Sequence, residues 1–201
     1  MLRKADYDPK TPELFLSCGF PIAACEVRIL DDNDQEVAMG EAGEICVRAT
    51  HVMAEYWKRP EQTAETLRSG WLHTGDIARK DERGYMFILD RKKDMIVSGG
   101  FNIFPREIED VLSQHADVAM VAVVGIPDDK WGEAVTAVVV LRNGGRPNAD
   151  ELIALVKARK GSTHAPKHIK FVTELPMTGV GKVDKKVLKA GFWIGRERMV
   201  G

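Results

Sequence analysis

Two long apolar runs rich in β-branched residues restrict the fold of this chain more than any other feature. They cover residues 118–126 and 134–141, and continuous runs of this kind are typical of strands buried on both faces. The other elements predicted in this half are a strand at 169–172 and three helices. One helix is opened by Pro105, and the other two cover 148–160 and 182–189. Strands that alternate with helices pack in layers. Residues 95–201 are therefore predicted to form a small α/β domain, a three-stranded sheet with flanking helices.

The first 90 residues carry a different pattern. Short alternating segments predict strands, and turn clusters such as Asp31-Asp32-Asn33-Asp34 separate them. One helix is predicted where Pro60 opens a run of helix formers. Residues 1–90 are therefore predicted to be β-rich, and the charged run at residues 91–94 is predicted to join them to the second domain. The predicted fold class is a mixed α+β and α/β architecture.

Composition excludes several classes of protein. Hydrophobic residues make up 44% of the chain and charged residues 29%, which is the balance of a globular chain and not of a disordered one. No apolar run approaches the roughly 20 residues that cross a bilayer, and the N-terminus lacks the apolar core of a signal peptide. We expect a cytoplasmic globular protein, and the length of 201 residues taken alone fits a complete one.

The cysteines and histidines predict no metal centre. Cys18, Cys25 and Cys46 are odd in number and have no CxxC spacing, so neither a disulfide framework nor a zinc site is expected. They are predicted to be small buried residues in a reducing compartment. His164 and His168 are four residues apart, but a proline between them disfavours a helix that would present both.

Charge is unevenly distributed although the formal net charge is −1. Residues 156–201 contain 11 lysines and arginines against 3 aspartates and glutamates, a local charge of +8, whereas the first 155 residues carry −9. A basic segment attracts phosphate-bearing partners, whether a nucleotide, a coenzyme or a nucleic acid. A solvated helical face explains the same charge without a partner, and both interpretations stay open at this point.

Two glycine-containing loops are candidate binding elements. In Thr74-Gly75-Asp76 the carboxylate can contact paired hydroxyls such as those of a ribose, and a tight turn with an Asx hydrogen bond is the alternative. In Ser98-Gly99-Gly100 the lack of side chains lets a ligand or another backbone come close, and a loop that needs positive φ is the alternative.

A third loop, PMTGVGK at residues 176–182, ends in a lysine. Lysine is a compact, movable cation that suits a phosphate or a developing negative charge. The loop is not a Walker A motif, because the GxxxxGK[ST] spacing is missing. A solvated surface lysine is the alternative interpretation of Lys182.

Taken together and in this order, these segments resemble the C-terminal part of the adenylate-forming superfamily. Its members are acyl-CoA synthetases, adenylation domains of peptide synthetases and firefly-type luciferases. The resemblance extends from about Gly19 to Lys186. The segments that carry it are Gly43-Glu44-Ile45-Cys46-Val47-Arg48, Trp71-Leu72-His73-Thr74-Gly75-Asp76, Asp90-Arg91-Lys92-Lys93-Asp94, the stretch from Gly99 to Glu109, and the stretch from Pro176 to Lys182.

The resemblance implies a role for several residues in the first half-reaction. Asp76 would hold the ribose hydroxyls of ATP and AMP, and Arg91 would reach the ribose or a phosphate. Lys93 would be the hinge about which the small domain turns. Lys182 would be the catalytic lysine that bridges the substrate carboxylate and the α-phosphate during adenylation.

For the second half-reaction the resemblance implies contacts with CoA. Gly99 and Gly100 would line the tunnel for the pantetheine arm, and Trp131 and Lys167 would lie near the nucleotide end of the coenzyme. His164 stands where many relatives have a bulkier or basic residue. The implied cofactors are ATP or AMP and CoA, together with Mg²⁺ whose ligands lie outside this chain in the full-length enzyme.

Several motifs of the superfamily are absent from these 201 residues. The phosphate loop, the threonine–glutamate motif that grips magnesium and the acyl pocket precede the matching region in relatives. The resemblance therefore implies the C-terminal part of the large AMP-binding domain at 1–90, a hinge at 91–94 and the mobile C-terminal domain at 95–201. We expect part of an ATP-dependent acyl-CoA synthetase for a long- or medium-chain fatty acid, inactive as an isolated fragment.

Two other functions are alternatives. An adenylation domain of a peptide synthetase would share the hinge and the glycine motif, although the short tail at 191–196 is typical of stand-alone synthetases. A non-enzymatic basic interaction domain, such as a nucleic-acid binder, would use the +8 segment, although no interleaving of aromatic and basic residues supports it. The sequence predicts no oligomeric state.

Overall fold

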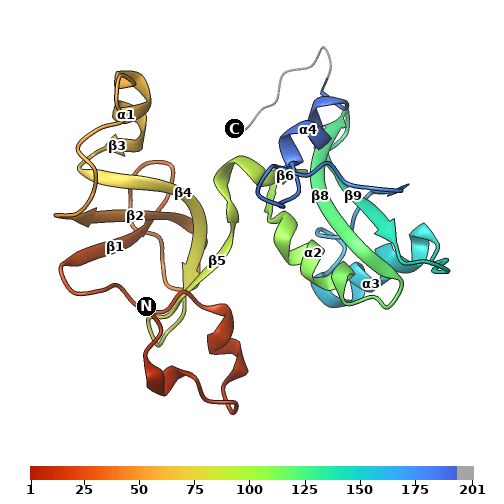
Figure 1. Cartoon of the computed structure of the whole chain (residues 1–201), viewed down its shortest axis with the longest axis horizontal. Coiled ribbons are helices and arrows are strands. Elements are labelled where there is room, and N and C mark those ends of the chain that lie inside the picture. Colours follow the sequence, from red (N-terminus) through yellow and green to blue (C-terminus); the bar gives the residue numbers. More distant parts are fainter. Residues whose placement is uncertain (194–201) are drawn as a thin grey trace. The chain divides into compact units, whose positions relative to one another are not determined.

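The computed structural model describes residues 1–193. Contacts between residues divide the chain into two compact units, Met1–Lys92 and Lys93–Gly201 (Figure 1). Of the predicted tail, residues 194–196 lie outside the described residues. Within the described part of the chain, no helix has the length and apolarity that a transmembrane span requires.

The first unit is built on a five-stranded antiparallel sheet, which confirms the β-rich prediction. Its strands are β1 (Cys25–Leu30), β2 (Gly43–Ala49), β3 (Leu67–Arg68), β4 (Trp71–Lys80) and β5 (Met86–Arg91). The order is β1-β2-β4-β3, and β5 also pairs with β4. The helical elements are α1 (Pro60–Thr66) and the 3₁₀ turns η1 (Lys4–Asp6), η2 (Pro12–Leu16) and η3 (Lys92–Asp94), the last of which crosses the boundary between the units.

One prediction for the first unit is wrong. Residues 73–76 were expected to form a polar loop, but they lie inside the ten-residue strand β4. Turn-forming residues are compatible with this strand because the segment forms a bulge opposite β2. At a bulge the backbone departs from regular strand geometry.

The cysteines also differ in part from expectation. All three carry free thiols, as predicted, but only Cys46 is buried, in a cluster with Leu30 and Trp71. Cys25 is half-buried and Cys18 is exposed. Burial raises the pKa of the Cys46 thiol to about 12, and the nearby carboxylate of Glu44 adds to this shift.

This arrangement predicts selective alkylation. Because the thiolate is the reactive form, Cys46 is expected to resist iodoacetamide at pH 8 in the folded chain, while the half-buried Cys25 is modified. Mass spectrometry of digested peptides would locate each label. Addition of denaturant should expose Cys46 and permit its modification. Labelling of Cys46 in the folded chain as fast as Cys25 would contradict the structure.

The second unit confirms the mixed α/β class but corrects the strand count from three to five. Its strands are β6 (Ile96–Ser98), β7 (Phe101–Ile103), β8 (Val118–Asp128), β9 (Gly132–Leu141) and β10 (His168–Val172). The order is β10-β9-β6-β7, with β8 also paired to β9. The two strands missed by the prediction, β6 and β7, have three residues each and flank a glycine pair, so they give no periodic signal.

Three helices cover both faces of the second sheet (Figure 1). On one face, α2 (Pro105–Ser113) and α3 (Ala149–Lys160) bury Ile108, Leu112, Leu152 and Val156 completely. Asn148 caps α3, since its side chain accepts the Glu151 N–H at 2.7 Å. The fully buried side chains form the core of the unit, and the loops extend from this core. On the opposite face lies α4 (Lys185–Ala190), whose Leu188 packs near Ala122 and Val138.

Candidate functional site

Asp76 lies at a bulge in the sheet of the first unit. Cys46 of β2 is paired with His73 of β4 and Glu44 with Ile77, so three residues of β4 lie opposite the single residue between them. Gly75 in the middle has a φ of +75°, which glycine adopts without strain. A bulge of this kind redirects the side chain that follows it, here the carboxylate of Asp76.

Hydrogen bonds from the second strand fix this bulge. The Thr74 hydroxyl donates to the carbonyl of Ile45 at 2.8 Å and accepts the Asp76 N–H at 3.1 Å. The Gly75 N–H donates to Oε1 of Glu44 at 2.9 Å. The alternative of an Asx turn is thus replaced by a bulge in which a threonine side chain and a glutamate side chain hold the backbone.

The bulge brings Asp76 and Arg91 together, as a shared ligand would require. The two residues face each other across β4 and β5, and Nε of Arg91 lies 3.2 Å from Oδ1 of Asp76. Both side chains remain accessible, with 60% of Arg91 and 30% of Asp76 exposed. A carboxylate and a guanidinium at accessible positions on neighbouring strands can receive a ligand that carries both hydroxyls and phosphates.

Sequence reasoning missed Glu44, a buried carboxylate that is 5% exposed. Its Oε2 accepts from Nζ of Lys92 at 3.3 Å and lies 3.2 Å from Nδ1 of His73. Burial by itself would raise the pKa of Glu44, but the Gly75 N–H, His73 and Lys92 outweigh it and hold this pKa below its usual range. The signal in the sequence was a charged residue directly before the apolar stretch Ile45-Cys46-Val47 of the strand.

Glu44, Cys46 and His73 also form a group of potential metal ligands, whose ligand atoms lie within 4.8 Å of one another. A thiol and an imidazole do not match the oxygen ligands that Mg²⁺ requires. Lys92 and Arg68 approach the same carboxylate oxygen at 3.3 and 3.6 Å, and their charges oppose a bound divalent cation. This group therefore does not fit the magnesium ion that the sequence resemblance implied.

In the second unit, Gly99 and Gly100 form the tight turn between β6 and β7. Their φ values are +59° and +82°, as a two-residue hairpin turn with two positive φ angles requires. The Gly99 N–H donates to the carbonyl of Trp131 at 2.9 Å. A Cβ at Gly99 would lie 2.7 Å from Cε3 of Trp131, so the indole packs directly on the glycine backbone.

Two lysines flank the indole of Trp131. Nζ of Lys130 and Nζ of Lys167 lie 4.9 and 5.0 Å from the ring centroid, within the range of cation–π contacts. The structure thus gathers Gly99, Trp131 and Lys167 of the predicted site and adds Lys130. An aromatic surface with two cations beside a bare backbone suits a ligand that combines a narrow chain with phosphates.

A matched pair of substitutions tests the packing of Trp131 on Gly99. Gly99→Ala should destabilise the second unit by about 1–3 kcal/mol more than Gly100→Ala. Both positions have positive φ and both replacements are strained, but only the methyl group at Gly99 meets the indole. Urea unfolding followed through hydrogen exchange of the β8 and β9 amides provides the measurement. Equal destabilisation by the two substitutions would contradict this packing.

Lys182 ends a turn whose backbone is fixed rather than loose. Met177 and Val183 form an isolated β-bridge, and Thr178 N–H donates to the carbonyl of Lys182 at 2.7 Å. The Lys182 N–H in turn donates to Oγ1 of Thr178 at 3.2 Å. The predicted helix over 182–189 begins only at Lys185, because Asp184 caps it. Lys182 itself is exposed, so a hydrogen-bonded turn presents its side chain to solvent.

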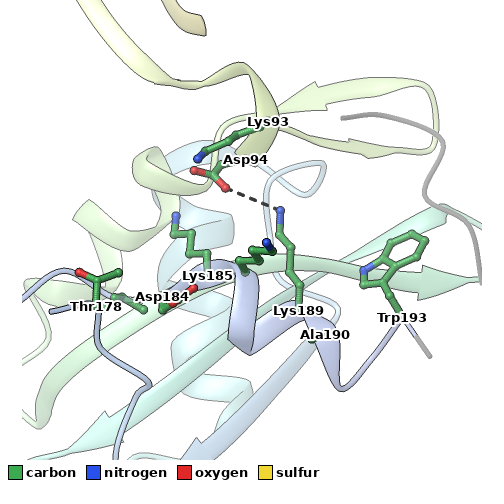
Figure 2. A pocket seen from close by; sticks show the side chains of 10 residues that line it. Lys93, Asp94, Thr178, Asp184, Lys185, Lys189, Ala190 and Trp193 are labelled. Carbon is green, nitrogen blue, oxygen red and sulfur yellow. Dashed lines mark ion pairs between the residues drawn. The ribbon is translucent and has the colours of Figure 1, made fainter. Parts of the chain in front are cut away.

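The turn of Lys182 and the start of the second unit share a cavity of about 600 Å³. Lys93, Asp94 and Thr178 line it together with residues of α4 (Figure 2). Figure 2 shows Asp94 and Lys189 pointing toward each other, with Oδ1 and Nζ 3.9 Å apart. The first residues after the boundary thus lie beside α4, the helix that follows the Lys182 turn.

Comparisons with known proteins agree with these features. Residues 107–182 match the family described as AMP-binding enzyme C-terminal domain, and residues 5–57 match the family described as AMP-binding enzyme. Over its whole length the chain is 51% identical to the medium/long-chain fatty-acid–CoA ligase FadD8 of Mycobacterium tuberculosis. The chain belongs to the AMP-binding enzyme family. It spans 36% of the length of that ligase.

Two solved structures share the fold of this AMP-binding enzyme chain. The amide bond synthetase McbA from Marinactinospora thermotolerans is 41% identical, with a TM-score of 0.81 over 90% of this chain and 37% of that one. The o-succinylbenzoate CoA synthetase of Bacillus subtilis, solved with its acyl-adenylate intermediate, is 36% identical, with a TM-score of 0.82 over 89% of this chain and 36% of that one. The resemblance inferred from the sequence motifs is thereby confirmed.

Proposed function

We propose that this chain supplies the ribose-binding aspartate and the C-terminal catalytic unit of an ATP-dependent acyl-CoA synthetase. A carboxylate and ATP would give an acyl-adenylate and pyrophosphate, and the adenylate and CoA would then give acyl-CoA and AMP. The observation that carries the proposal is that the candidate site residues are divided between the two units. The Asp76–Arg91 pair lies in one unit and the Lys182 turn in the other, and the chain passes from the first unit to the second between Lys92 and Lys93.

In the first half-reaction, Asp76 accepts hydrogen bonds from the ribose hydroxyls and Arg91 contacts the ribose or a phosphate. A carboxylate that attacks the α-phosphate brings two negative groups together. The ammonium group of Lys182 lies between them and stabilises the charge that they share in the transition state. The fixed backbone of the Lys182 turn supports this role, because it limits positional freedom to the side chain.

In the second half-reaction, the C-terminal unit turns about Lys93 and replaces the lysine with a different surface. The Gly99-Gly100 turn lines the passage for the pantetheine arm. Trp131 and Lys167 contact the nucleotide end of CoA. The packing of Trp131 on Gly99 and the position of Lys167 over the Trp131 ring support the assignment. In domain terms, residues 1–90 complete the large AMP-binding domain, 91–94 form the hinge and 95–201 form the mobile domain.

Substrates and surroundings follow from the relatives. We place the acid among medium- or long-chain fatty acids, because the ligases of M. tuberculosis and of Salmonella typhimurium, 51% and 47% identical, are named for such acids. A feruloyl-CoA synthase from Amycolatopsis is 45% identical, so aryl acids belong in any substrate panel. Magnesium would act in the full-length enzyme through ligands outside these residues. The reaction uses cytoplasmic substrates, and we place the enzyme in the cytoplasm.

A chimera tests the proposal. The 201 residues replace the matched segment of the mycobacterial ligase, and acyl-CoA formation is measured with ATP, CoA and a panel of fatty and aryl acids. We expect the chimera to form acyl-CoA and the isolated chain to release no pyrophosphate, because the motifs for the ATP phosphates and the acyl group lie elsewhere in relatives. A folded chimera without activity would refute the proposed function, and robust turnover by the isolated chain would refute the expected division of the site.

A further inference from the structure

We infer that Glu44 is a positioning residue for Asp76, an inference that rests on the proposed function of Asp76 in ribose binding. Glu44 lies on β2 and has no place in the mechanism described above. Its buried carboxylate meets the bulge of β4 one residue before Asp76.

The bulge creates the need for this carboxylate. Between the pairs Glu44–Ile77 and Cys46–His73, the register between β2 and β4 shifts, and the Gly75 N–H loses a regular ladder partner. A partly buried N–H without an acceptor is costly, and Oε1 of Glu44 accepts that of Gly75 at 2.9 Å. The direction of the Asp76 side chain thus depends on a side chain 32 residues earlier in the sequence.

The negative charge of Glu44 is compensated by cations. Lys92, the last residue of the first unit, donates to Oε2 at 3.3 Å and to Asp32 at 2.7 Å. Asp32 is 85% exposed, so it contacts Lys92 from the solvent side and does not reach into the bulge. Lys92 and Arg68 therefore balance the charge at Oε2 of Glu44, while Oε1 accepts the N–H of Gly75. Two separate tasks fall on its two oxygens.

This division predicts the effects of graded substitutions in the chimera. Glu44→Ala removes the acceptor and should raise the KM for ATP about tenfold while kcat for thioester formation from supplied acyl-adenylate changes little. Glu44→Gln keeps an oxygen that accepts the Gly75 N–H and should restore most of the affinity. Asp32→Asn, which perturbs only the outer contact of Lys92, is the matched control and should leave the KM unchanged.

A double-mutant cycle separates positioning from general destabilisation. Because Glu44 acts through Asp76, Glu44→Ala should add less than about twofold to the KM of a chimera that already carries Asp76→Ala. Full additivity of the two effects would overturn the inference. An Ala variant as active as the unsubstituted chimera, or a Gln variant as impaired as Ala, would overturn it as well.

A measurement on the chain itself keeps the inference distinct from the proposed function. Hydrogen exchange of the Gly75 amide, followed by NMR in the 201-residue chain, should be at least about tenfold faster in Glu44→Ala than in Glu44→Gln. Unchanged exchange would refute the Glu44–Gly75 link whatever the chimera does. An inactive unsubstituted chimera with the expected exchange would refute only the proposed function. If Glu44→Ala fails to fold, Glu44→Asp, which keeps the charge but withdraws the oxygen from Gly75, carries the same expectations.

Discussion

Replacement of Lys182 by alanine is expected to slow adenylation by the chimera about a hundredfold or more and to spare thioester formation from supplied acyl-adenylate. The side chain is exposed at the end of a turn whose backbone is closed by Thr178, so its removal disturbs no packed structure. Under the proposed mechanism, what is lost is the ammonium group that would bridge the attacking carboxylate and the α-phosphate. The second half-reaction neutralises no such pair of negative groups.

Two rates measure this split. Pyrophosphate release with acid and ATP reports adenylation, and acyl-CoA formation from a synthetic acyl-adenylate and CoA reports the second step. Lys157→Ala provides the control, because Lys157 is an exposed lysine on α3 and belongs to the same basic segment, residues 156–201. Equal losses in both steps, or an equal effect of Lys157→Ala, would refute a specific role for Lys182 in adenylation.

Replacement of Asp76 by alanine is expected to raise the KM for ATP about ten- to hundredfold, since hydrogen bonds to a charged acceptor contribute about 1.5–3 kcal/mol each. The folded structure should tolerate the change. Asp76 is 30% exposed and its partner Arg91 is 60% exposed, and ion pairs at such accessible positions contribute about 0–1 kcal/mol. The loss should therefore appear in nucleotide affinity and not in stability.

Titration of ATP against initial rates, together with thermal unfolding of the same variants, distinguishes these effects. Asp110→Ala is the matched control, because Asp110 is an exposed carboxylate on α2. An unchanged KM for ATP in a folded Asp76→Ala chimera would show that the ribose is held elsewhere. A large fall in the unfolding temperature of that variant would assign Asp76 a structural role.

The core of the second unit could be predicted from the sequence because its signals are local. The apolar runs at 118–126 and 134–141 became β8 and β9, and the helix predicted to open at Pro105 became α2. Such periodicity depends only on neighbours in the chain. By contrast, β6 and β7 are too short to show a period, and their pairing with each other and of Ser98 with Gly132 of β9 involves few residues.

The candidate site shows the same contrast between local sequence signals and contacts that only the fold creates. Asp76, Arg91 and Lys182 could be proposed from motifs, but their surroundings could not. The strand at Thr74-Gly75-Asp76 looks like a loop in sequence because its backbone partner is the distant carboxylate of Glu44. The contact of Trp131 with Gly99 joins segments about 30 residues apart, and only the fold brings them together.

The most direct test of the account follows one oxygen atom. The chimera is supplied with ATP, CoA and a fatty acid whose carboxylate oxygens are ¹⁸O. If the carboxylate attacks the α-phosphate, its oxygen bridges acyl group and AMP in the intermediate and leaves with AMP when the thiol attacks the carbonyl carbon. Mass spectrometry should then find one labelled oxygen in the AMP formed with each acyl-CoA. Label in inorganic phosphate, or AMP without label beside newly formed acyl-CoA, would contradict the adenylation chemistry proposed for this chain.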